Sequence, residues 1–560
     1  MTHWTCDQCL VSTNPVSVLK CLSCEAIRPD LSPEEIAKIV EDQARAKADA
    51  ISKFRSPASE PSGFFFGAPA ETPQTPVTFG FAAPFLPSIP QSPANTIAFG
   101  FTPVEPVQNR KQCDKPETGK LPMGDLFVHG SGECEQLGLG EGLLERKKPT
   151  HVKSISNVVA VSCGSLHNIA LCQGGKVVSW GCNDDGALGR SGTENVPESV
   201  AFPEGVDVKA ISAGDCHSAF IDTSDTLWLC GTYKDSSGHL GFPSGEAAKS
   251  VPKQKEPVKI TGLLPTSKRL VVSELSCGAN HTAVLIRPVG AKKDTLVLWG
   301  NDEFGQLGQG NRGDTAGLDE RWALELKHSA RSKRKIQSKL HPHPIAWNEK
   351  THGGAISHVF CTANATFVVT DKDDVYACGL NNFCQLGLGQ PSAEPVREFT
   401  RVNALCGLGV VSICGGSFHT VALTKGGEVW AWGRGDYCGL GNTTGDIPAP
   451  KRIHGLTNIS SLAAGGSHSL ACDSNGDFFT WGFGETHQLA NCPRDISQGA
   501  AKASDDAKDE LRPYLVQSKQ LSEKFVFAVA AGAQHSVELG WTGHYDEEIQ
   551  AKAKKRAREE

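Results

Sequence analysis

Methionine and tyrosine are scarce in this sequence, with 2 and 5 residues among 560, and no run of 18 apolar residues occurs. Without such a run, the sequence predicts no helix that spans a membrane. The first twenty residues also lack the charged and apolar segments of a secretory signal, so we expect no export. A positive net charge is absent as well: the chain carries −7, which argues against coating of DNA through bulk charge.

Glycine and cysteine, by contrast, are plentiful, with 59 and 20 residues. So much glycine indicates many turns between short strands, and the length favours several domains or one repeat array. Disulfides are not expected in a long chain without a secretory signal. The cysteines therefore indicate a reducing compartment.

Four of the cysteines are concentrated in residues 1–30. Their spacing is C-x2-C-x11-C-x2-C, supplied by Cys6, Cys9, Cys21 and Cys24. Two such pairs provide four thiolates for a tetrahedral Zn²⁺ ion, and so short a segment needs the metal to fold. The spacing therefore predicts a zinc finger.

Residues 31–118 predict a helix followed by a linker. The sequence Ser-Pro-Glu-Glu from position 32 is a capping box, and the helix over 32–53 has a thin apolar face that fits a spacer better than a partner-binding helix. The Pro-, Ser- and Ala-rich composition of 54–118 predicts disorder. Exposed Phe-Gly dipeptides in such a tether can act as multivalent contacts, although a plain linker explains much of the composition. These dipeptides start at Phe66, Phe79 and Phe99.

An internal repeat fills residues 119–545. Each unit has a histidine at the start of a strand-like run, at His167, His217, His281, His419, His468 and His535, with Ala365 in the equivalent place of one unit. A second half follows, marked by Trp180, Cys230, Trp299, Cys378, Trp432 and Trp481, each before a glycine. Residues 129–138 supply a spare second half ahead of the first histidine, and the last unit lacks one. The sequence therefore predicts an all-β fold, a seven-bladed β-propeller whose N-terminal strands complete the last blade.

The repeated histidine favours a structural role over metal binding or catalysis. An active site needs one such residue, whereas a residue present in nearly every blade is expected to hold the blades through a buried hydrogen bond. The chain also lacks a P-loop and a Gly-x-Ser-x-Gly elbow. A hydrolase or an oxidoreductase is therefore not supported.

The runs at 137–149, 181–190 and 212–220 resemble the regulator of chromosome condensation family. Its members are chromatin-bound guanine-nucleotide exchange factors for the small GTPase Ran. The resemblance implies non-covalent catalysis, in which the protein stabilises the nucleotide-free GTPase and so lowers the barrier to GDP release. The alternative is a non-catalytic propeller adaptor that binds Ran, chromatin or the nuclear pore.

The family resemblance also implies a set of site residues. The longer run at 231–241 resembles the wedge that the family inserts beside the nucleotide, although an ordinary lengthened hairpin is the alternative. Its expected tip comprises Tyr233, Lys234, Asp235, Ser236, Ser237 and Gly238. The family's acidic positions align with Glu133, Asp215 and Asn280, and a further family histidine aligns with His419. Glu133 replaces the usual Asp and Asn280 replaces an acid, which puts the details of the Ran contact in doubt.

Chromatin docking is implied by a loop after the third blade, residues 311–326, which resembles the family's nucleosome-binding loop. Arg312 and Arg321 match its basic positions and are expected to contact the histone acidic patch. The basic run that follows, with Lys333, Arg334 and Lys335, is expected to contact DNA phosphates, with a solvated loop as the alternative.

The N-terminal finger resembles the zinc fingers of Ran-binding nucleoporins. Leu10, Val11 and Asn14 stand where those fingers bind Ran-GDP; ubiquitin and RNA are the alternatives. The Phe-Gly dipeptides resemble those of nucleoporins and their transport partners, so contact with nuclear transport factors is expected. The basic residues of the tail, 546–560, indicate a nuclear-import signal or a basic helix end. Together these features imply a nuclear, chromatin-associated protein with possible pore association, in which the tethered finger captures Ran-GDP for the propeller.

Overall fold

The computed structural model describes residues 3–4, 14–15, 116–117, 120–236, 238–243, 250–264, 266, 268–310, 340–441, 445–492 and 508–547. The four finger cysteines, Leu10, Val11, the linker up to residue 115, the docking loop with its basic run, and residues 548–560 of the tail lie outside these residues. In the N-terminal unit, β1 (His3–Trp4) pairs antiparallel with β2 (Asn14–Pro15). No helix in the described part of the chain has the length and apolar character needed to cross a membrane.

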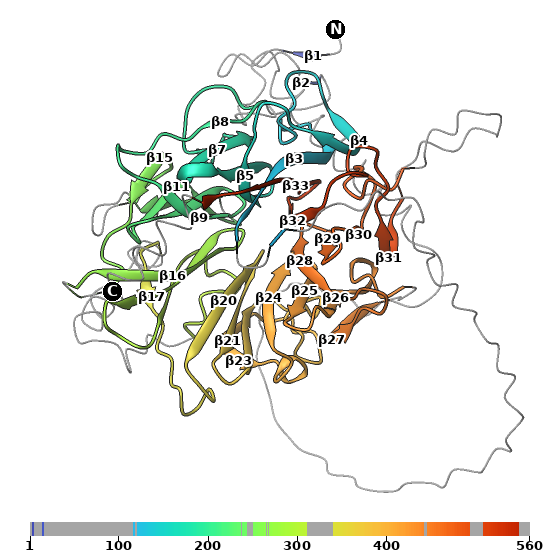
Figure 1. The fold of residues 1–560 in the computed structure, drawn as a ribbon. Coiled ribbons are helices and arrows are strands. Elements are labelled where there is room, and N and C mark those ends of the chain that lie inside the picture. Colours follow the sequence, from blue (N-terminus) through green and yellow to red (C-terminus); the bar gives the residue numbers. More distant parts are fainter. Residues whose placement is uncertain are drawn as a thin grey trace, which may run out of the picture. The chain divides into compact units, whose positions relative to one another are not determined.

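The second unit is built from antiparallel blades of four strands arranged around a common centre (Figure 1): blades 2 to 6 are separate four-stranded sheets, and blades 7 and 1 are joined through β3 and β5 in one eight-stranded sheet. Blade 1 contains β5 (Val158–Cys163), β6 (His167–Cys172), β7 (Lys176–Gly181) and β8 (Glu198–Ser199). Blade 2 contains β9 (Val208–Ala213), β10 (His217–Asp222), β11 (Leu227–Gly231) and β15 (Gln254–Lys259), and blade 3 contains β16 (Leu270–Cys277), β17 (His281–Pro288), β18 (Thr295–Gly300) and β19 (His343–Pro344). Blade 4 contains β20 (Ile356–Thr362), β21 (Ala365–Thr370), β22 (Val375–Gly379) and β23 (Val396–Arg401), and blade 5 contains β24 (Val410–Gly415), β25 (His419–Thr424), β26 (Val429–Arg434) and β27 (Asp446–Arg452). Blade 6 contains β28 (Ile459–Ala464), β29 (His468–Asp473), β30 (Phe478–Gly482) and β31 (Glu510–Leu515).

Blade 7 confirms the predicted closure of the ring. It joins β32 (Val526–Ala531) and β33 (His535–Tyr545) from the end of the repeat to β3 (Pro122–Ser131) and β4 (Glu145–His151) from its beginning. The strands β3 and β33 run antiparallel in a long register that places Phe127 opposite Glu538. Because the two ends of the array share one sheet, neither leaves an open edge at the point of closure.

The second strands of blades 1, 2, 4, 5 and 6 are buried along almost their whole length. The Trp-Gly half of the repeat fills the space between blades, because Trp180, Trp299, Trp432 and Trp481 are fully buried. The Trp180 indole donates to the Gln136 carbonyl of the preceding blade at 3.1 Å. A side chain at Gly138 would collide with that indole, which explains why a glycine recurs there.

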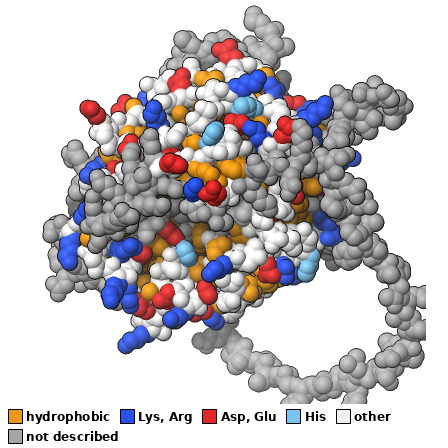
Figure 2. Space-filling model, in the orientation of Figure 1, with side chains coloured by type: hydrophobic (Ala, Val, Ile, Leu, Met, Phe, Trp, Pro, Cys, Tyr) orange, Lys and Arg blue, Asp and Glu red, His pale blue; other side chains and the backbone are white. Residues whose placement is uncertain are grey.

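The outer strands of the blades carry exposed charged side chains. The fourth strands carry charged residues at exposed positions, for example Lys255 and Glu256 in β15 and Lys451 and Arg452 in β27. Basic and acidic side chains are interspersed over the surface visible in Figure 2. Charged outer strands prevent edge-to-edge pairing with other chains.

The repeated histidines have the predicted structural role. Each ring is fully buried, and its Nε2 contacts a hydroxyl at the start of the next blade's second strand: His167 with Ser218 at 2.9 Å, His217 with Thr282 at 2.9 Å, His281 with Thr366 at 3.0 Å, His419 with Ser469 at 2.7 Å, and His468 with Ser536 at 3.0 Å. The series ends with His535, which contacts Asn168 Oδ1 at 2.8 Å and so joins blade 7 to blade 1. Burial lowers the pKa of these rings, for example to about 4 at His167. They therefore stay neutral at physiological pH.

Candidate functional site

One face of the propeller collects most of the residues predicted for nucleotide exchange. In each blade, the turn between the first two strands lies at the same end as the connection that leaves the third strand, because the strands alternate in direction. We call this end the hairpin face. It carries Glu133 in the β3–β4 connection, Asp215 in the β9–β10 turn, and Asn280 in the β16–β17 turn.

The insertion predicted at 231–241 is a hairpin on this face. It consists of β12 (Tyr233–Asp235) and β13 (Gly238–Pro243), with a third strand, β14 (Ser250–Val251), beside β13. Asp235 pairs with Gly238 at the end of the ladder, so Ser236 belongs to the tip. Ser236 is exposed, Ser237 lies outside the described residues, and Gly238 has a φ of 120°, which explains the glycine.

Tyr233 does not lie at the tip, so that part of the prediction is wrong. Its side chain is fully buried, its hydroxyl contacts Thr282 Oγ1 at 2.8 Å, and its ring packs on Phe242 at 4.8 Å. The cause is the pairing of the hairpin, in which Tyr233 pairs opposite Gly241 at the base. Tyr233 anchors the hairpin in the core and is not available to a partner.

The hairpin is held from blade 3 by three polar side chains. Asn280 Oδ1 accepts a hydrogen bond from the backbone N–H of Lys234 at 2.7 Å, and Asn301 Nδ2 donates to the Lys234 carbonyl at 2.9 Å. Glu303 accepts from the backbone N–H of Ser236 at 3.0 Å. Asn280, which departs from the acidic residue of the family pattern, thus has a structural role in orienting the hairpin.

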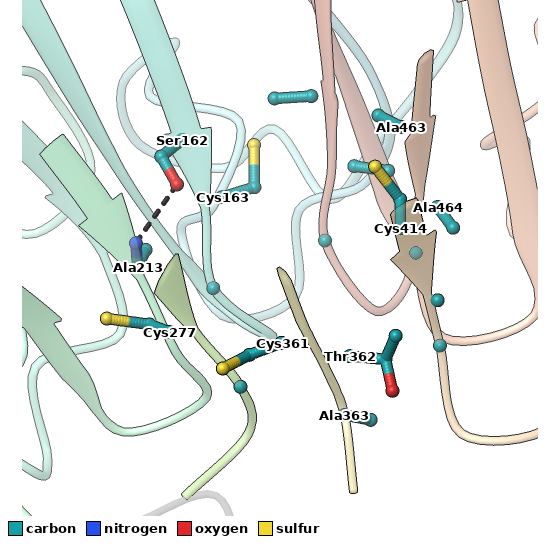
Figure 3. Close-up of a pocket in the computed structure, with 18 of the residues that line it drawn as sticks. Ser162, Cys163, Ala213, Cys277, Cys361, Thr362, Ala363, Cys414, Ala463 and Ala464 are labelled. Atoms are coloured by element: carbon teal, nitrogen blue, oxygen red, sulfur yellow. Dashed lines mark hydrogen bonds between the residues drawn. The ribbon is translucent and has the colours of Figure 1, made fainter. Parts of the chain in front are cut away.

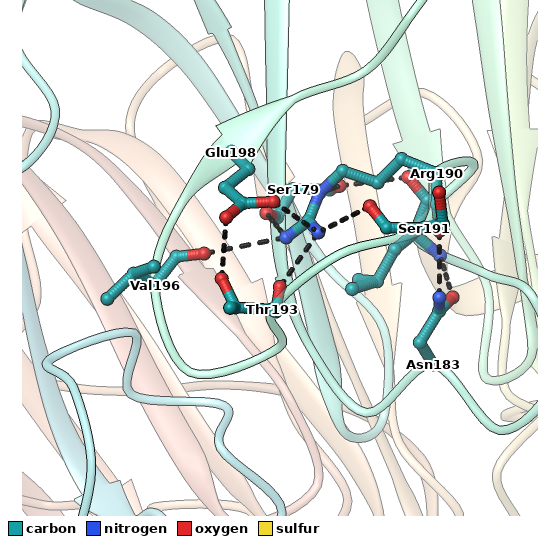
Figure 4. A network of polar contacts seen from close by, with 8 residues as sticks. Ser179, Asn183, Arg190, Ser191, Thr193, Val196 and Glu198 are labelled. Atoms are coloured by element: carbon teal, nitrogen blue, oxygen red, sulfur yellow. Dashed lines mark hydrogen bonds and ion pairs between the residues drawn. The ribbon is translucent and has the colours of Figure 1, made fainter.

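Blade 1 holds the other side of the hairpin. The Lys234 ammonium lies 2.6 Å from Asp185 Oδ2. Asp185 belongs to the connection after β7, and Arg190 organises that connection, as Figure 4 shows. The buried Arg190 guanidinium donates to the carbonyls of Ser179 and Thr193, each at 2.7 Å.

The same connection is closed by Asn183, whose side chain donates to the Arg190 carbonyl at 2.9 Å and accepts from Leu188 N–H at 3.0 Å. Glu198 completes the set with an ion pair to Arg190 at 3.1 Å. This network fixes the position of Asp185 and, through it, of the hairpin lysine. The run at 181–190 indicated a family resemblance, but the sequence did not reveal this role. The role depends on contacts between loops, which no local pattern displays.

Among the described residues, acidic side chains are prominent on the hairpin face. Glu133, Asp184, Asp436 and Glu485 are exposed on it. Two of its basic side chains are engaged, since Lys234 pairs with Asp185 and Arg434 lies 3.6 Å from Asp436. Such a face attracts a basic partner surface and raises the rate of encounter.

His419 does not reach this face. Its ring is fully buried and bonded to Ser469, and burial lowers its pKa to about 4. The structure therefore places His419 with the other blade-bridging histidines. The contact that the resemblance implied for it would require a change in this packing.

A central channel opens among the inner strands, with a volume of about 380 Å³. Figure 3 shows that it is lined by small side chains and by the thiols of Cys163, Cys277, Cys361 and Cys414. Burial raises the pKa of these thiols, to about 12 at Cys277, so they stay protonated. Asp215 lies at the channel rim, where burial raises the pKa of its carboxyl, opposed by Ser165 and by the charge of Lys234.

The described residues contain no cluster of metal-ligating side chains. Within the described ranges, no group of three or more His, Cys, Asp or Glu side chains is arranged to hold a metal ion. The zinc prediction rests on cysteines outside these ranges and remains a prediction.

Comparison with known proteins places the propeller in a family. Residues 125–538 match the model of the RCC1-like domain. The chain is 31% identical over 432 residues to the mouse regulator of chromosome condensation, covering 74% of this chain and 90% of that protein; the human protein gives 31% over 430 residues with the same coverage. The structure of Prp20p from Saccharomyces cerevisiae, described with its binding properties to Gsp1p and histones, superposes with a TM-score of 0.62 at 24% identity, covering 80% of this chain and 96% of Prp20p. Human WBSCR16 shares the fold with a TM-score of 0.56 at 19% identity, covering 75% and 100%.

Proposed function

Since this chain belongs to the regulator of chromosome condensation family, we propose that it is a guanine-nucleotide exchange factor for the small GTPase Ran, acting in the nucleus on chromatin. The observation that carries this proposal is the hairpin held between blades 1 and 3 on the acidic face. A hairpin without such contacts would be an ordinary long connection. Here its backbone is bonded to Asn280, Asn301 and Glu303 before any partner binds.

The proposed mechanism is differential binding. A rigid hairpin whose position is fixed in advance loses little conformational entropy when it inserts beside the bound nucleotide. Acidic side chains of the face compete for the basic groups that otherwise hold the nucleotide phosphates. Every ~1.4 kcal/mol by which the nucleotide-free GTPase is favoured over the nucleotide-bound state increases release about tenfold. No covalent step is required.

Release of a fluorescent GDP analogue from Ran tests this proposal. The full chain is expected to accelerate release strongly, and Asp184→Lys, at an exposed position of the hairpin face, is expected to reduce that acceleration. Glu204→Lys is the matched control, because Glu204 is exposed in the β8–β9 connection at the opposite end of the strands. No acceleration by the folded chain would refute exchange activity and favour the non-catalytic adaptor.

We propose further that the N-terminal finger binds Zn²⁺ and captures Ran-GDP for the hairpin face. Support comes from the spacing of Cys6, Cys9, Cys21 and Cys24 and from the tether that raises the local concentration of the captured GTPase. Cys6→Ser is expected to raise the Ran concentration needed for half-maximal exchange without lowering the maximal rate. Binding of ubiquitin or RNA by the finger, with no binding of Ran-GDP, would contradict this role.

Chromatin attachment is proposed to use the segment 311–339. Prp20p, a structural relative, is described as binding histones. Replacing Arg312 and Arg321 by Ala is expected to weaken nucleosome binding at all salt concentrations, whereas replacing Lys333, Arg334 and Lys335 is expected to reduce its salt dependence. Contact with nuclear transport factors through the Phe-Gly dipeptides belongs to the same proposal; Kap60 has been seen bound to Prp20 of yeast.

A further inference from the structure

A cysteine, a histidine and a glutamate meet where blade 6 contacts the closing blade. Cys492 and His487 lie in the connection between β30 and β31, and Glu145 is the first residue of β4. The Cys492 sulfur is 3.2 Å from His487 Nδ1, and His487 Nε2 is 3.3 Å from Glu145 Oε2. These contacts arrange a nucleophile, a base and a carboxylate in sequence.

The surroundings fix this arrangement. His487 has a φ of 62° in a turn closed by hydrogen bonds from His487 N–H to Gly484 and from Ala490 N–H to His487. Lys148 of β4 donates to the Ala490 carbonyl at 2.7 Å. Glu510 of β31 accepts a hydrogen bond from the side chain of Asn491, the residue before Cys492, at 2.9 Å. Contacts from two strands thus fix the turn that carries His487 beside Cys492.

The chemistry of such a group is specific. The sulfur reacts as a thiolate, and an adjacent imidazole stabilises the thiolate by taking its proton. The carboxylate lies 3.3 Å from Nε2, on the side of the ring opposite the sulfur, where its negative charge favours the imidazolium. Glu145 is half-exposed and His487 is largely buried, so the ring is shielded from solvent while the carboxylate reaches it from the surface.

Other described cysteines lie in different surroundings. Cys134 occupies the β3–β4 connection, which corresponds to that of Cys492 in the neighbouring blade, but burial and the charges of Glu133 and Asp184 raise its pKa. Burial likewise raises the pKa of the channel thiols Cys277 and Cys361, to about 12 in each case. Cys492 is itself largely buried, with an exposed fraction of 6%, which restricts the site to small reagents.

We propose that Cys492, His487 and Glu145 form a thiol-modification site that reacts with small electrophiles, with peroxides as the oxidant class. In the peroxide reaction, the thiolate sulfur forms a bond to one oxygen as the O–O bond breaks. The leaving hydroxide takes the proton from the imidazolium and departs as water, which leaves a sulfenic acid on Cys492 and a neutral His487. The sulfur is oxidised and the peroxide is reduced.

Alkylation of the folded full chain by iodoacetamide, resolved for each cysteine by mass spectrometry across pH, tests this site. For Cys492 the midpoint of the rate profile is expected about one pH unit or more below the ordinary ~8.5 of a free cysteine. His487→Asn, which keeps a residue that tolerates the left-handed backbone, is expected to return the midpoint to about 8.5 or above. His544→Gln, at an exposed histidine of β33, is the matched control and should leave the profile unchanged.

A second variant keeps the test decisive if His487→Asn fails to fold. Glu145→Gln changes a half-exposed residue at the start of an outer strand and is expected to raise the midpoint by several tenths of a unit. A wild-type midpoint at or above ~8.5, or no labelling of Cys492 in the folded chain at any pH, would overturn the proposal. So would a lowered midpoint that neither substitution moves.

Discussion

The contact that closes the ring gives the sharpest stability prediction. His535 Nε2 meets Asn168 Oδ1 at 2.8 Å, and Asn168 Nδ2 donates to the Gln136 carbonyl at 2.8 Å. At the equivalent place in blade 2, Ser218 both meets His167 at 2.9 Å and donates to Ala187 at 2.8 Å. A serine at position 168 is therefore expected to retain both functions.

The magnitude follows from what each substitution leaves unpaired. Asn168→Ala leaves the buried His535 Nε2 without an acceptor, and such an orphaned group costs about 1–3 kcal/mol. The Gln136 carbonyl loses the bond from Asn168 but keeps its bond from the Trp180 indole, so this second loss adds little to the cost. Asn168→Ser is expected to cost under about 1 kcal/mol, because its hydroxyl can serve both partners.

Urea-induced unfolding of the full chain, followed by tryptophan fluorescence, measures the difference. Trp180 is fully buried beside the contact and reports on its loss. His535→Ala combined with Asn168→Ala should cost less than the sum of the two single changes, since both remove the same bond. Equal midpoints for the Ala and Ser variants, or strict additivity, would refute the assigned role of this bond.

Three further predictions follow from the same structure. Glu538 is buried in blade 7, and burial raises the pKa of its carboxyl above the unfolded value. The contribution of Glu538 to the free energy of unfolding therefore falls as the pH rises from about 4.5 through the folded pKa, with a slope of at most about 1.4 kcal/mol per pH unit. Glu538→Gln is expected to flatten this dependence in urea unfolding between pH 5 and 8, and parallel curves for the two proteins would contradict it. Gly278→Ala would place a Cβ 2.1 Å from His281 Cε1, so we expect a loss of about 1–3 kcal/mol in thermal unfolding, and an unchanged melting temperature would contradict the packing described. Asn301→Ala removes one bond to the hairpin and also the bond that Asn301 Oδ1 accepts from Glu303 N–H at 2.7 Å, so it is expected to slow Ran exchange about two- to tenfold and to cost about 1–3 kcal/mol in thermal unfolding; an unchanged rate would mean that the hairpin needs no such support.

The sequence by itself determined the architecture, because the number of repeat units gives the number of blades. Six histidines and one alanine at equivalent positions predicted seven units, and the spare half-unit at 129–138 predicted which strands close the ring. The structural role of the histidines also followed, since a residue present in nearly every blade serves packing. These inferences need only periodicity, which a single sequence displays in full.

The details of the hairpin depended on the tertiary structure. A lengthened run predicted a projecting hairpin, but strand register decided that Tyr233 is buried at its base. The residues that hold it, Asp185, Asn301 and Glu303, come from two other blades. No local pattern records such contacts, because each side chain is an ordinary polar residue of a connecting loop.

The site at Cys492 shows most clearly what the sequence alone determines and what the tertiary structure decides. Its cysteine and histidine are neighbours in sequence, but Glu145 lies on the strand that the start of the propeller contributes beside blade 6. Closure of the ring brings these residues together. Periodicity fixes how many blades pack around the axis, whereas the chemistry of an interface is set by which side chains the closed ring places within bonding distance.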